Sequence, residues 1–255
     1  MTITATAAPL LKYLVRLADD NVVLGQRLSE YIASAPEIEE DLAVANIGLD
    51  HIGVAQHLFS YAAEVEGEGR TEDDFAFWRT EREFTNALLV EQPHEGFGEL
   101  IARQFLFDAY QLELWEALSR SSDERLAGIA AKALKEARYH LRHTSSWVVR
   151  LGDGTDESHR RMQDAVGAMW RFTGELFEAD DLDRQMADEG VGVDPTTLHQ
   201  AWTATVDEIL AEATLHRPDD PYQASGGRSG MHSEHLGHLL AEMQWMQRTY
   251  PGLQW

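Results

Sequence analysis

Apolar residues recur every three or four positions along nearly the whole of this 255-residue chain, and strand-type alternation is almost absent. This spacing places apolar side chains on one face of an α-helix, so the chain is predicted to be all-helical. The first helix is expected at about 9–33. Its stripe consists of Leu14, Leu17, Asn21, Leu24, Leu28 and Tyr31. Further helices are expected at about 37–65, 98–120, 124–151, 157–178, 195–215 and 231–249.

Residues that start or stop helices separate these segments. Pro36 is expected in the first turn of the second helix, and Gly67 at the left-handed position after its end. Asp123 is expected to cap the helix at 124–151. Asp194 and Pro195 are expected to open the helix at 195–215.

The lengths of the connections predict a topology. Short links join the first long helix to the second and the third to the fourth, whereas residues 66–97 separate the second from the third. Short links imply antiparallel neighbours, and one long crossover is typical of ferritin-like four-helix bundles. We therefore expect one domain over 1–255, with a core bundle at about 9–151 and additional helices at 157–249. Within the crossover, the dense segment 78–93 either lines a ligand or partner, or covers the bundle end as a short helix.

Composition excludes several classes of function. The chain has 21 Lys and Arg against 44 Asp and Glu, and 21 − 44 gives a formal charge of −23. Such a polyanion lacks the positive charge that nucleic acid and anionic membrane surfaces attract. The absence of cysteine excludes disulfides, thiolate nucleophiles and Cys-held iron–sulfur clusters. No apolar run approaches the ~20 residues that cross a bilayer, and the first residues lack the features of a secretory signal. A cytoplasmic protein is expected.

A ferritin-like bundle raises the question of a metal site. Such bundles hold two metal ions with one Glu from each of two helices and a Glu-x-x-His pair from each of the other two. The inward mid-helix positions read from the sequence are Asp20, Asp50, Asp108 and Glu136. Three residues after Asp50 and Glu136 stand Gly53 and Tyr139, so both expected histidines are missing. The sequence therefore predicts a degenerate di-iron site, with no catalytic residue and no bound metal or cofactor.

Three interpretations of these carboxylates remain open. They form a buried hydrogen-bond network with Asn46, Tyr139 and His140, which Lys135 or Arg138 extends. Alternatively, a metal binds with His57 and His140 as substitute ligands. In the third interpretation, they are ordinary polar residues on helices whose orientation differs from the one assumed.

Two C-terminal features carry weaker signals. His235, His238 and Glu242 share one helical face, and His232 precedes them by one turn, so the set is either a transition-metal site or a polar stripe. The glycine-rich residues 226–230 lack the phosphate-loop pattern and are expected to form a flexible loop.

Several long segments together resemble the C-subunit family of the phenylacetyl-CoA 1,2-epoxidase complex. They are DLAVANIGLDHIG, SYAAEVEGEG, EREFTNALLVEQP, IARQFLFDAY, AKALKEARYHLRH, MWRFTGELF and HSEHLGHLLAEMQ. The resemblance extends from about residue 10 to the end of the chain.

This resemblance implies a monooxygenase component of phenylacetate catabolism. In that family, a paralogous A subunit holds the di-iron centre, and a reductase subunit with flavin and iron–sulfur groups takes electrons from NADPH. The C subunit is noncatalytic and structural, and forms a heterodimer with A that assembles further; no nucleic acid or membrane is involved. By resemblance, the positions near the partner or the phenylacetyl-CoA substrate are Glu83, Phe84, Thr85 and Asn86, and more loosely Arg184, Gln185 and Met186.

Two other functions remain open at this point. The chain is a free-standing di-iron or dimanganese oxidase that uses a degenerate carboxylate and histidine site, or it is an acyl-CoA-binding module without a catalytic partner. Metal content separates the first alternative from a noncatalytic subunit, and binding of a CoA thioester by the isolated chain would indicate the second.

Overall fold

The computed structural model describes residues 7–219 and 222–253, and within them the chain folds into ten α-helices and short 3₁₀ turns, without a strand. The predicted all-α class is confirmed. The chain divides into two compact units, one made of 1–92 with 226–255 and the other of 93–225. A single domain over 1–255 stays a prediction. Among the described residues, no helix has both the length and the apolar character needed to cross a bilayer.

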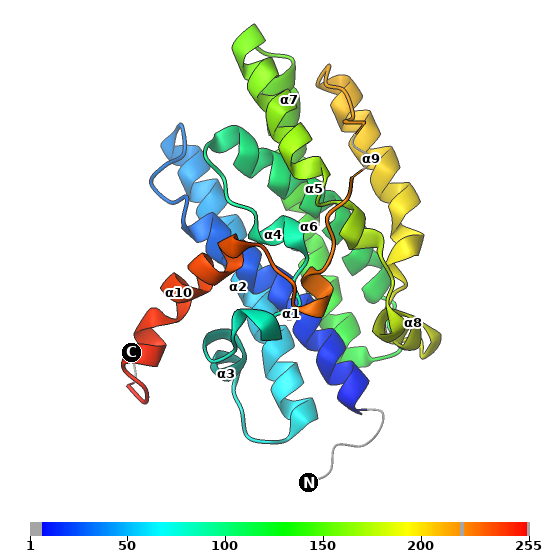
Figure 1. The fold of residues 1–255 in the computed structure, drawn as a ribbon. Helices are drawn as coiled ribbons and strands as arrows, with labels where there is room; N and C mark the ends of the chain where they lie inside the picture. The colour runs from blue at the N-terminus through cyan, green and yellow to red at the C-terminus, as the bar shows by residue number, and fades with distance from the viewer. Residues whose placement is uncertain (1–6, 220–221, 254–255) are drawn as a thin grey trace. The chain divides into compact units, whose positions relative to one another are not determined.

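The first unit is built on a hairpin of α1 (Ala7–Ser29) and α2 (Ile38–Glu66), which pack side by side (Figure 1). The predicted stripe of α1 is buried along its whole length. The two helices approach closely at Gly25 and Gly48, because a Cβ atom on Gly25 would lie 2.9 Å from Ile52 Cγ1 and 3.1 Å from the Gly48 carbonyl oxygen. Gly67 ends α2 in the left-handed conformation, as predicted, with φ of 71°.

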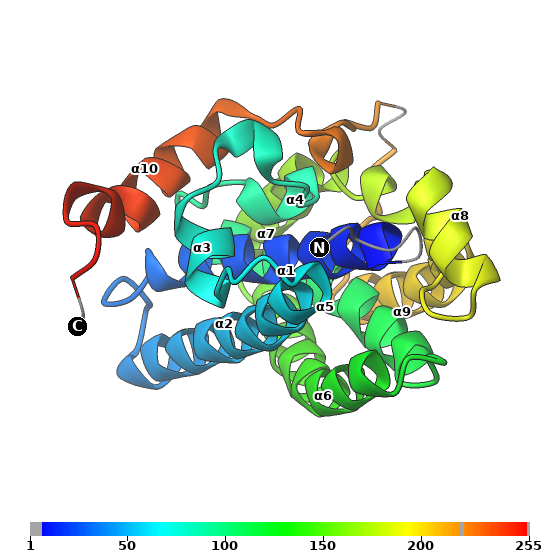
Figure 2. The same cartoon turned by 90° about the horizontal axis from the view of Figure 1, so that it is seen from below.

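The connection after α2 is folded against the C-terminal helix. It contains α3 (Glu72–Phe77), a 3₁₀ turn η1 (Glu81–Glu83) and α4 (Leu88–Glu91). The last helix, α10 (Glu234–Thr249), packs on α3 and follows the 3₁₀ turn η4 (Gly227–Ser229) (Figure 2). The buried amide of Gln244 on α10 donates 3.0 Å hydrogen bonds to the carbonyls of Ala76 and Arg79. Residues far apart in the sequence thus form one layer over α1.

The second unit is built on another hairpin, α5 with α6, and α5 is its central element. Of the 22 residues of α5, 15 are buried, because α6, α7 and α9 all pack against it. Trp202 on α9 donates a 2.9 Å hydrogen bond to the Leu106 carbonyl of α5. The elements of this unit are α5 (Phe97–Leu118), α6 (Glu124–Gly152), α7 (Asp156–Trp170), η2 (Gly174–Phe177), α8 (Asp181–Asp188), η3 (Pro195–Leu198) and α9 (His199–Glu212).

The structure confirms most predicted helix ends and corrects three details. Asp123 caps α6 by accepting from the Leu126 N–H, and Asp194 with Pro195 opens η3, which leads into α9. Pro36, in contrast, lies before α2, which begins after Glu37. The helix expected at 157–178 ends at Trp170 and continues as η2. The short helix α8, which Asp180 caps, is not predicted from the sequence.

Candidate functional site

The first unit carries a buried histidine on α2. His51 Nδ1 lies 2.9 Å from Asn21 Oδ1, and the Asn21 amide nitrogen donates to the Leu17 carbonyl at 2.8 Å. Both side chains are almost fully buried. Because the amide oxygen of Asn21 only accepts, the proton of the neutral imidazole lies on Nδ1, and Nε2 carries the lone pair.

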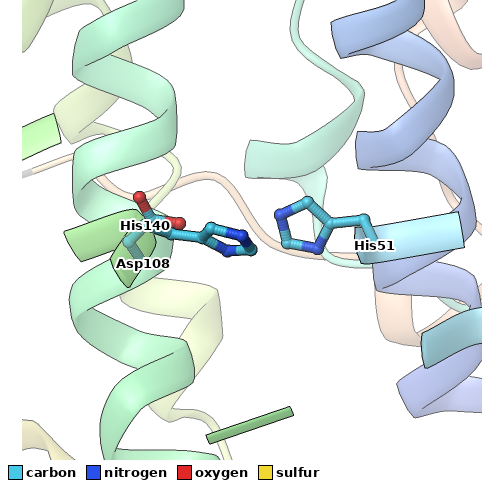
Figure 3. Close-up of side chains that lie close together, drawn as sticks. All are labelled: His51, Asp108 and His140. Atoms are coloured by element: carbon cyan, nitrogen blue, oxygen red, sulfur yellow. The ribbon is translucent and has the colours of Figure 1, made fainter. Parts of the chain in front are cut away.

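The second unit carries a buried carboxylate on α5 beside a buried histidine on α6. Asp108 accepts hydrogen bonds from Gln104 Nε2 at 2.7 Å and from Thr144 Oγ1 at 2.9 Å, so both of its oxygens are engaged. Burial raises the pKa of Asp108 to about 6, although the charge of His140 and these two hydrogen bonds oppose the rise. Figure 3 shows the side chains of His51, Asp108 and His140 with the helices that carry them.

The residues that face the interior on α2 and α6 are not the ones predicted from the sequence. They differ from the predicted positions by a fraction of a helical turn. The residue pairs that face the interior with Glu-x-x-His spacing are Gly48 with His51, and Ala137 with His140, and all four are buried. From the sequence, the missing histidines are expected at Gly53 and Tyr139. The histidines that face the interior of the two hairpins are instead His51 and His140, and the buried residues three positions before them are Gly48 and Ala137.

The residues present do not fit a two-metal carboxylate centre. Such a centre uses four carboxylates as well as two imidazoles. At the corresponding positions the chain has Asn21, Gly48, Asp108 and Ala137, so a single carboxylate remains. Gly48 contributes no side chain at its position, where a Cβ atom would make ordinary van der Waals contacts with α1, 3.4 Å from Leu28 Cβ and 3.5 Å from the Gly25 carbonyl oxygen.

The other positions assigned to the degenerate site lie toward the helix surfaces. Asp50, Gly53 and Glu136 are half-buried, and Tyr139 is 45% exposed. The predicted network partners Asn46, Lys135 and Arg138 are exposed, and so is His57, the substitute ligand of the second interpretation. The prediction that Asp50 and Glu136 face the core is wrong, because each is only half-buried and lies one residue before a buried residue, His51 and Ala137 respectively. The third interpretation, a different helix orientation, applies to these two residues.

Asp20 is buried as predicted, and its partners are one cation and one backbone N–H group of the first unit. Arg228 forms a bidentate ion pair with it, with distances of 2.8 and 2.9 Å, and the Ala87 N–H donates to it at 2.8 Å. Burial raises the pKa of the Asp20 carboxyl, and Arg228 opposes that rise. The neighbouring Asp19 is fully buried and pairs in the same bidentate manner with Arg79, which stacks over the Phe84 ring.

A third buried carboxylate, Glu91, pairs with His232. The His232 Nδ1 atom lies 2.7 Å from Glu91 Oε2, and its Nε2 atom lies 2.9 Å from the Phe84 carbonyl oxygen. Both partners accept, so the imidazole holds two protons and is cationic. Burial lowers the pKa of His232, and the hydrogen bond and charge of Glu91 raise it by more, so the net change is a raised pKa.

We call these seven residues the buried charge cluster. They are Asp19, Asp20, Arg27, Arg79, Glu91, Arg228 and His232. Arg27 joins the cluster by donating to the carbonyls of Glu91 and His235, both at 2.9 Å. The glycine-rich segment 226–230, expected to be a flexible loop, supplies one of its cations. Sequence reasoning missed this role because an arginine between glycines carries no local signal of its partner.

Most of the residues 83–86, which were predicted to lie near the substrate or the partner, are next to this buried charge cluster. Phe84 and Asn86 are fully buried, and Asn86 donates to Glu91 at 2.9 Å. Thr85 donates to Asp19 through its N–H and its hydroxyl, at 2.8 and 3.0 Å. Glu83 is exposed and caps η1, and hydrogen bonds from Thr80 lower its pKa. Three of these four side chains therefore support the fold of the first unit.

The second predicted segment forms part of α8. Met186 is fully buried, whereas Arg184 and Gln185 are exposed. Their hydrogen bonds are local, because Arg184 contacts Asp181 and the Ala179 carbonyl, and Gln185 contacts Glu189. A role near substrate or partner stays a prediction for both segments.

The histidines at the C-terminus serve different purposes. His232 lies before α10 and belongs to the buried charge cluster, His235 is half-buried and offers its carbonyl to Arg27, and His238 is exposed. Within the described ranges, no metal-binding group of His, Asp and Glu forms on α10. The polar stripe is thus the better description of His235, His238 and Glu242.

We predict that Arg228→Met lowers the free energy of unfolding by about 3–5 kcal/mol, because it leaves Asp20 buried without its cation. Arg217→Met is the matched control, since Arg217 pairs with Asp207 at 3.1 Å where both side chains are about half exposed. That change is expected to cost about 0–1 kcal/mol. Chemical denaturation of the two variants measures the difference. Equal free energies of unfolding for the two variants would show that the Asp20–Arg228 ion pair does not stabilise the segment 226–230.

We predict that the free energy of unfolding of the Asp108→Asn variant rises relative to that of the parent chain as pH rises. A folded pKa of about 6 against the ordinary 3.8 means that the folded protein binds this proton more tightly. The stability from Asp108 is therefore full below pH 3.8 and is lost as pH rises through about 6, by at most ~3 kcal/mol. Denaturation at about pH 4 and about pH 8 should show a relative gain for Asp108→Asn of that order. The exposed control Asp188→Asn should change far less, and parallel pH profiles for the two variants would contradict the prediction.

Comparison with known proteins identifies one family. The model of the family described as "Phenylacetic acid catabolic protein" matches residues 1–255. The chain is 53% identical over 243 residues to a protein from Escherichia coli (strain K12) that is named as the C subunit of 1,2-phenylacetyl-CoA epoxidase, and the match covers 95% of this chain and 98% of that relative. The all-helical structure is consistent with the ferritin-like fold of the family. The chain belongs to the phenylacetic acid catabolic protein family.

Proposed function

We propose that the chain is a noncatalytic, structural subunit of a multicomponent phenylacetyl-CoA epoxidase, in which it pairs with a di-iron catalytic A subunit. The observation that carries this proposal is the residue pattern Gly48-x-x-His51 and Ala137-x-x-His140. Both imidazoles of a two-metal centre are retained, and three of its four carboxylates are absent. The similarity to a relative named as the C subunit of the epoxidase supports the same assignment.

Coordination chemistry supports the noncatalytic role. Iron and manganese ions in such centres are held by carboxylates that bridge them and balance their charge. Here Asp108 is the single carboxylate at the four positions, and Gln104 and Thr144 engage both of its oxygens. The iron of the complex, and the flavin, iron–sulfur and NADPH chemistry, are assigned to the other subunits.

A paralogous fold without a metal still has a use in such a complex. A duplicated helical bundle retains the surfaces with which its ancestor assembled, and those surfaces do not depend on the metal ligands. The buried charge cluster fixes the long connection and the C-terminal segment of the first unit without any ion. The chain therefore provides a rigid partner surface, and we assign it the stabilisation of the A subunit.

We predict that the purified chain contains far less than one iron or manganese ion per chain, even after expression with added iron. The reason is the absence of carboxylates at Asn21, Gly48 and Ala137. Elemental analysis of the chain, with the A subunit purified in parallel as the positive control, measures this. Stoichiometric metal lost on changing His51→Ala or His140→Ala would instead support the free-standing oxidase.

Reconstitution tests the function itself. The chain alone, supplied with reductase, NADPH, dioxygen and phenylacetyl-CoA, should form no epoxide, and addition of the A subunit should restore product formation. Size-exclusion chromatography with light scattering should show a complex of the chain with A. Epoxide formation by the chain alone, or full activity and stability of A without the chain, would contradict the proposal.

A further inference from the structure

The helix α2 carries a second apolar face whose large side chains are exposed. Its members are large aliphatic residues, namely Ile38, Leu42, Leu49 and Ile52, with exposed fractions of 72%, 61%, 64% and 39%. Together with Ala45 they are spaced by four, three, four and three residues along the helix. This alternation is the spacing of a continuous seam that packs against another helix.

Most of this seam is distinct from the face that α2 uses within the first unit, and only Ile52, at its edge, also lies close to Gly25 of α1. The residues buried on α2 follow a separate line that includes Ile47, His51, Val54 and Leu58, and α1 packs beside it (Figure 2). A surface helix of a monomer normally has one apolar face and one polar face. Apolar residues on two sides of one helix indicate that the second side also has a partner, because extended exposed apolar surface is uncommon on monomers.

The charges around the seam restrict what that partner is. Between Ile38 and Glu66, α2 has six acidic residues and no Lys or Arg. Glu39 and Asp50 lie on one flank of the seam, where the side chain of Glu39 is exposed and that of Asp50 is half-buried. A second copy of this chain would bring the same acidic flanks together, and like charges in an interface are repulsive. A complementary partner presents an apolar helix face bordered by Lys or Arg.

We infer that the seam formed by Ile38, Leu42, Ala45, Leu49 and Ile52 is a docking surface for a helix of a different protein, with an apolar face bordered by basic residues. The inference rests on the proposed function, which supplies that protein as the catalytic A subunit. Aliphatic side chains of the seam bury against the partner helix, and Glu39 and Asp50 pair with its cations.

The test uses the complex formed by co-expression of the full chain with the A subunit. Leu42→Glu and Leu49→Glu each place a charge within the seam, and both are expected to reduce the amount of A captured on the tagged chain about tenfold or more. Leu253→Glu is the matched control, because Leu253 is 57% exposed and lies outside α2. It should capture A like the parent. Because these leucines are exposed, each isolated variant should melt at the temperature of the parent.

Charge reversal tests the chemistry of the partner separately. Glu39→Lys with Asp50→Lys should weaken capture of the A subunit, and the capture by the parent should fall as salt is raised, since exposed ion pairs are screened. Unchanged capture by this double variant would overturn the assignment of a basic border to the partner.

The outcomes separate this inference from the function on which it rests. If the parent chain captures A and the seam variants capture it equally well, the docking surface lies elsewhere and the proposed function stands. If the parent chain itself fails to capture the A subunit, both the docking inference and the proposed function are wrong. A homodimer of the isolated chain that Leu49→Glu dissociates would assign the seam to a second copy and overturn the inference.

Discussion

Two adjacent carboxylates on α1 organise the first unit. Asp19 and Asp20 are both buried, and each obtains its cation from a distant part of the chain, Arg79 at a separation of 60 residues and Arg228 at 208. An unpaired buried charge is strongly destabilising, so the folded state requires both distant segments in place. Glu91 and His232 repeat the arrangement at the other end of the connection. The long connection and the C-terminal segment are therefore fixed by electrostatic pairing as well as by apolar burial.

The interior of each hairpin shows how buried polar side chains are satisfied by protein groups. Gly25 allows α1 and α2 to pack closely, and Asn21 binds His51 through its amide oxygen. On the other hairpin, Asp108 keeps its position but is satisfied by Gln104 and Thr144. These side chains therefore have protein partners within the packed interior. The retained histidines thus belong to hydrogen-bonded or charged pairs in a packed interior.

The two sides of α2 suit one helix to folding and, through the docking that we infer, to assembly. The side with His51 packs on α1 and stabilises the hairpin, while the seam with Leu42 and Leu49 is left to solvent in the isolated chain. An acidic border on the seam disfavours pairing of identical chains and favours a basic partner. The noncatalytic role proposed for the chain and the selective surface on α2 are consistent with each other, because a structural subunit acts through the partner that it selects.

The sequence by itself determined the all-helical class, the hairpin topology with one long connection and most helix ends, such as those at Gly67 and Asp123. These features depend on local periodicity and on capping residues, which act over a few positions. It also predicted that Asp20 and Asp108 are buried, which the structure confirms, whereas the degenerate di-iron site stays a prediction. Only the tertiary structure decided that the helix faces of His51 and of Ala137 with His140 are buried, and not those of Asp50 and Glu136, because one residue turns a helix by about 100° and α2 is apolar on two sides. Likewise, only folding brought Arg228 to Asp20, since an ion pair between residues 208 positions apart leaves no local pattern in the sequence.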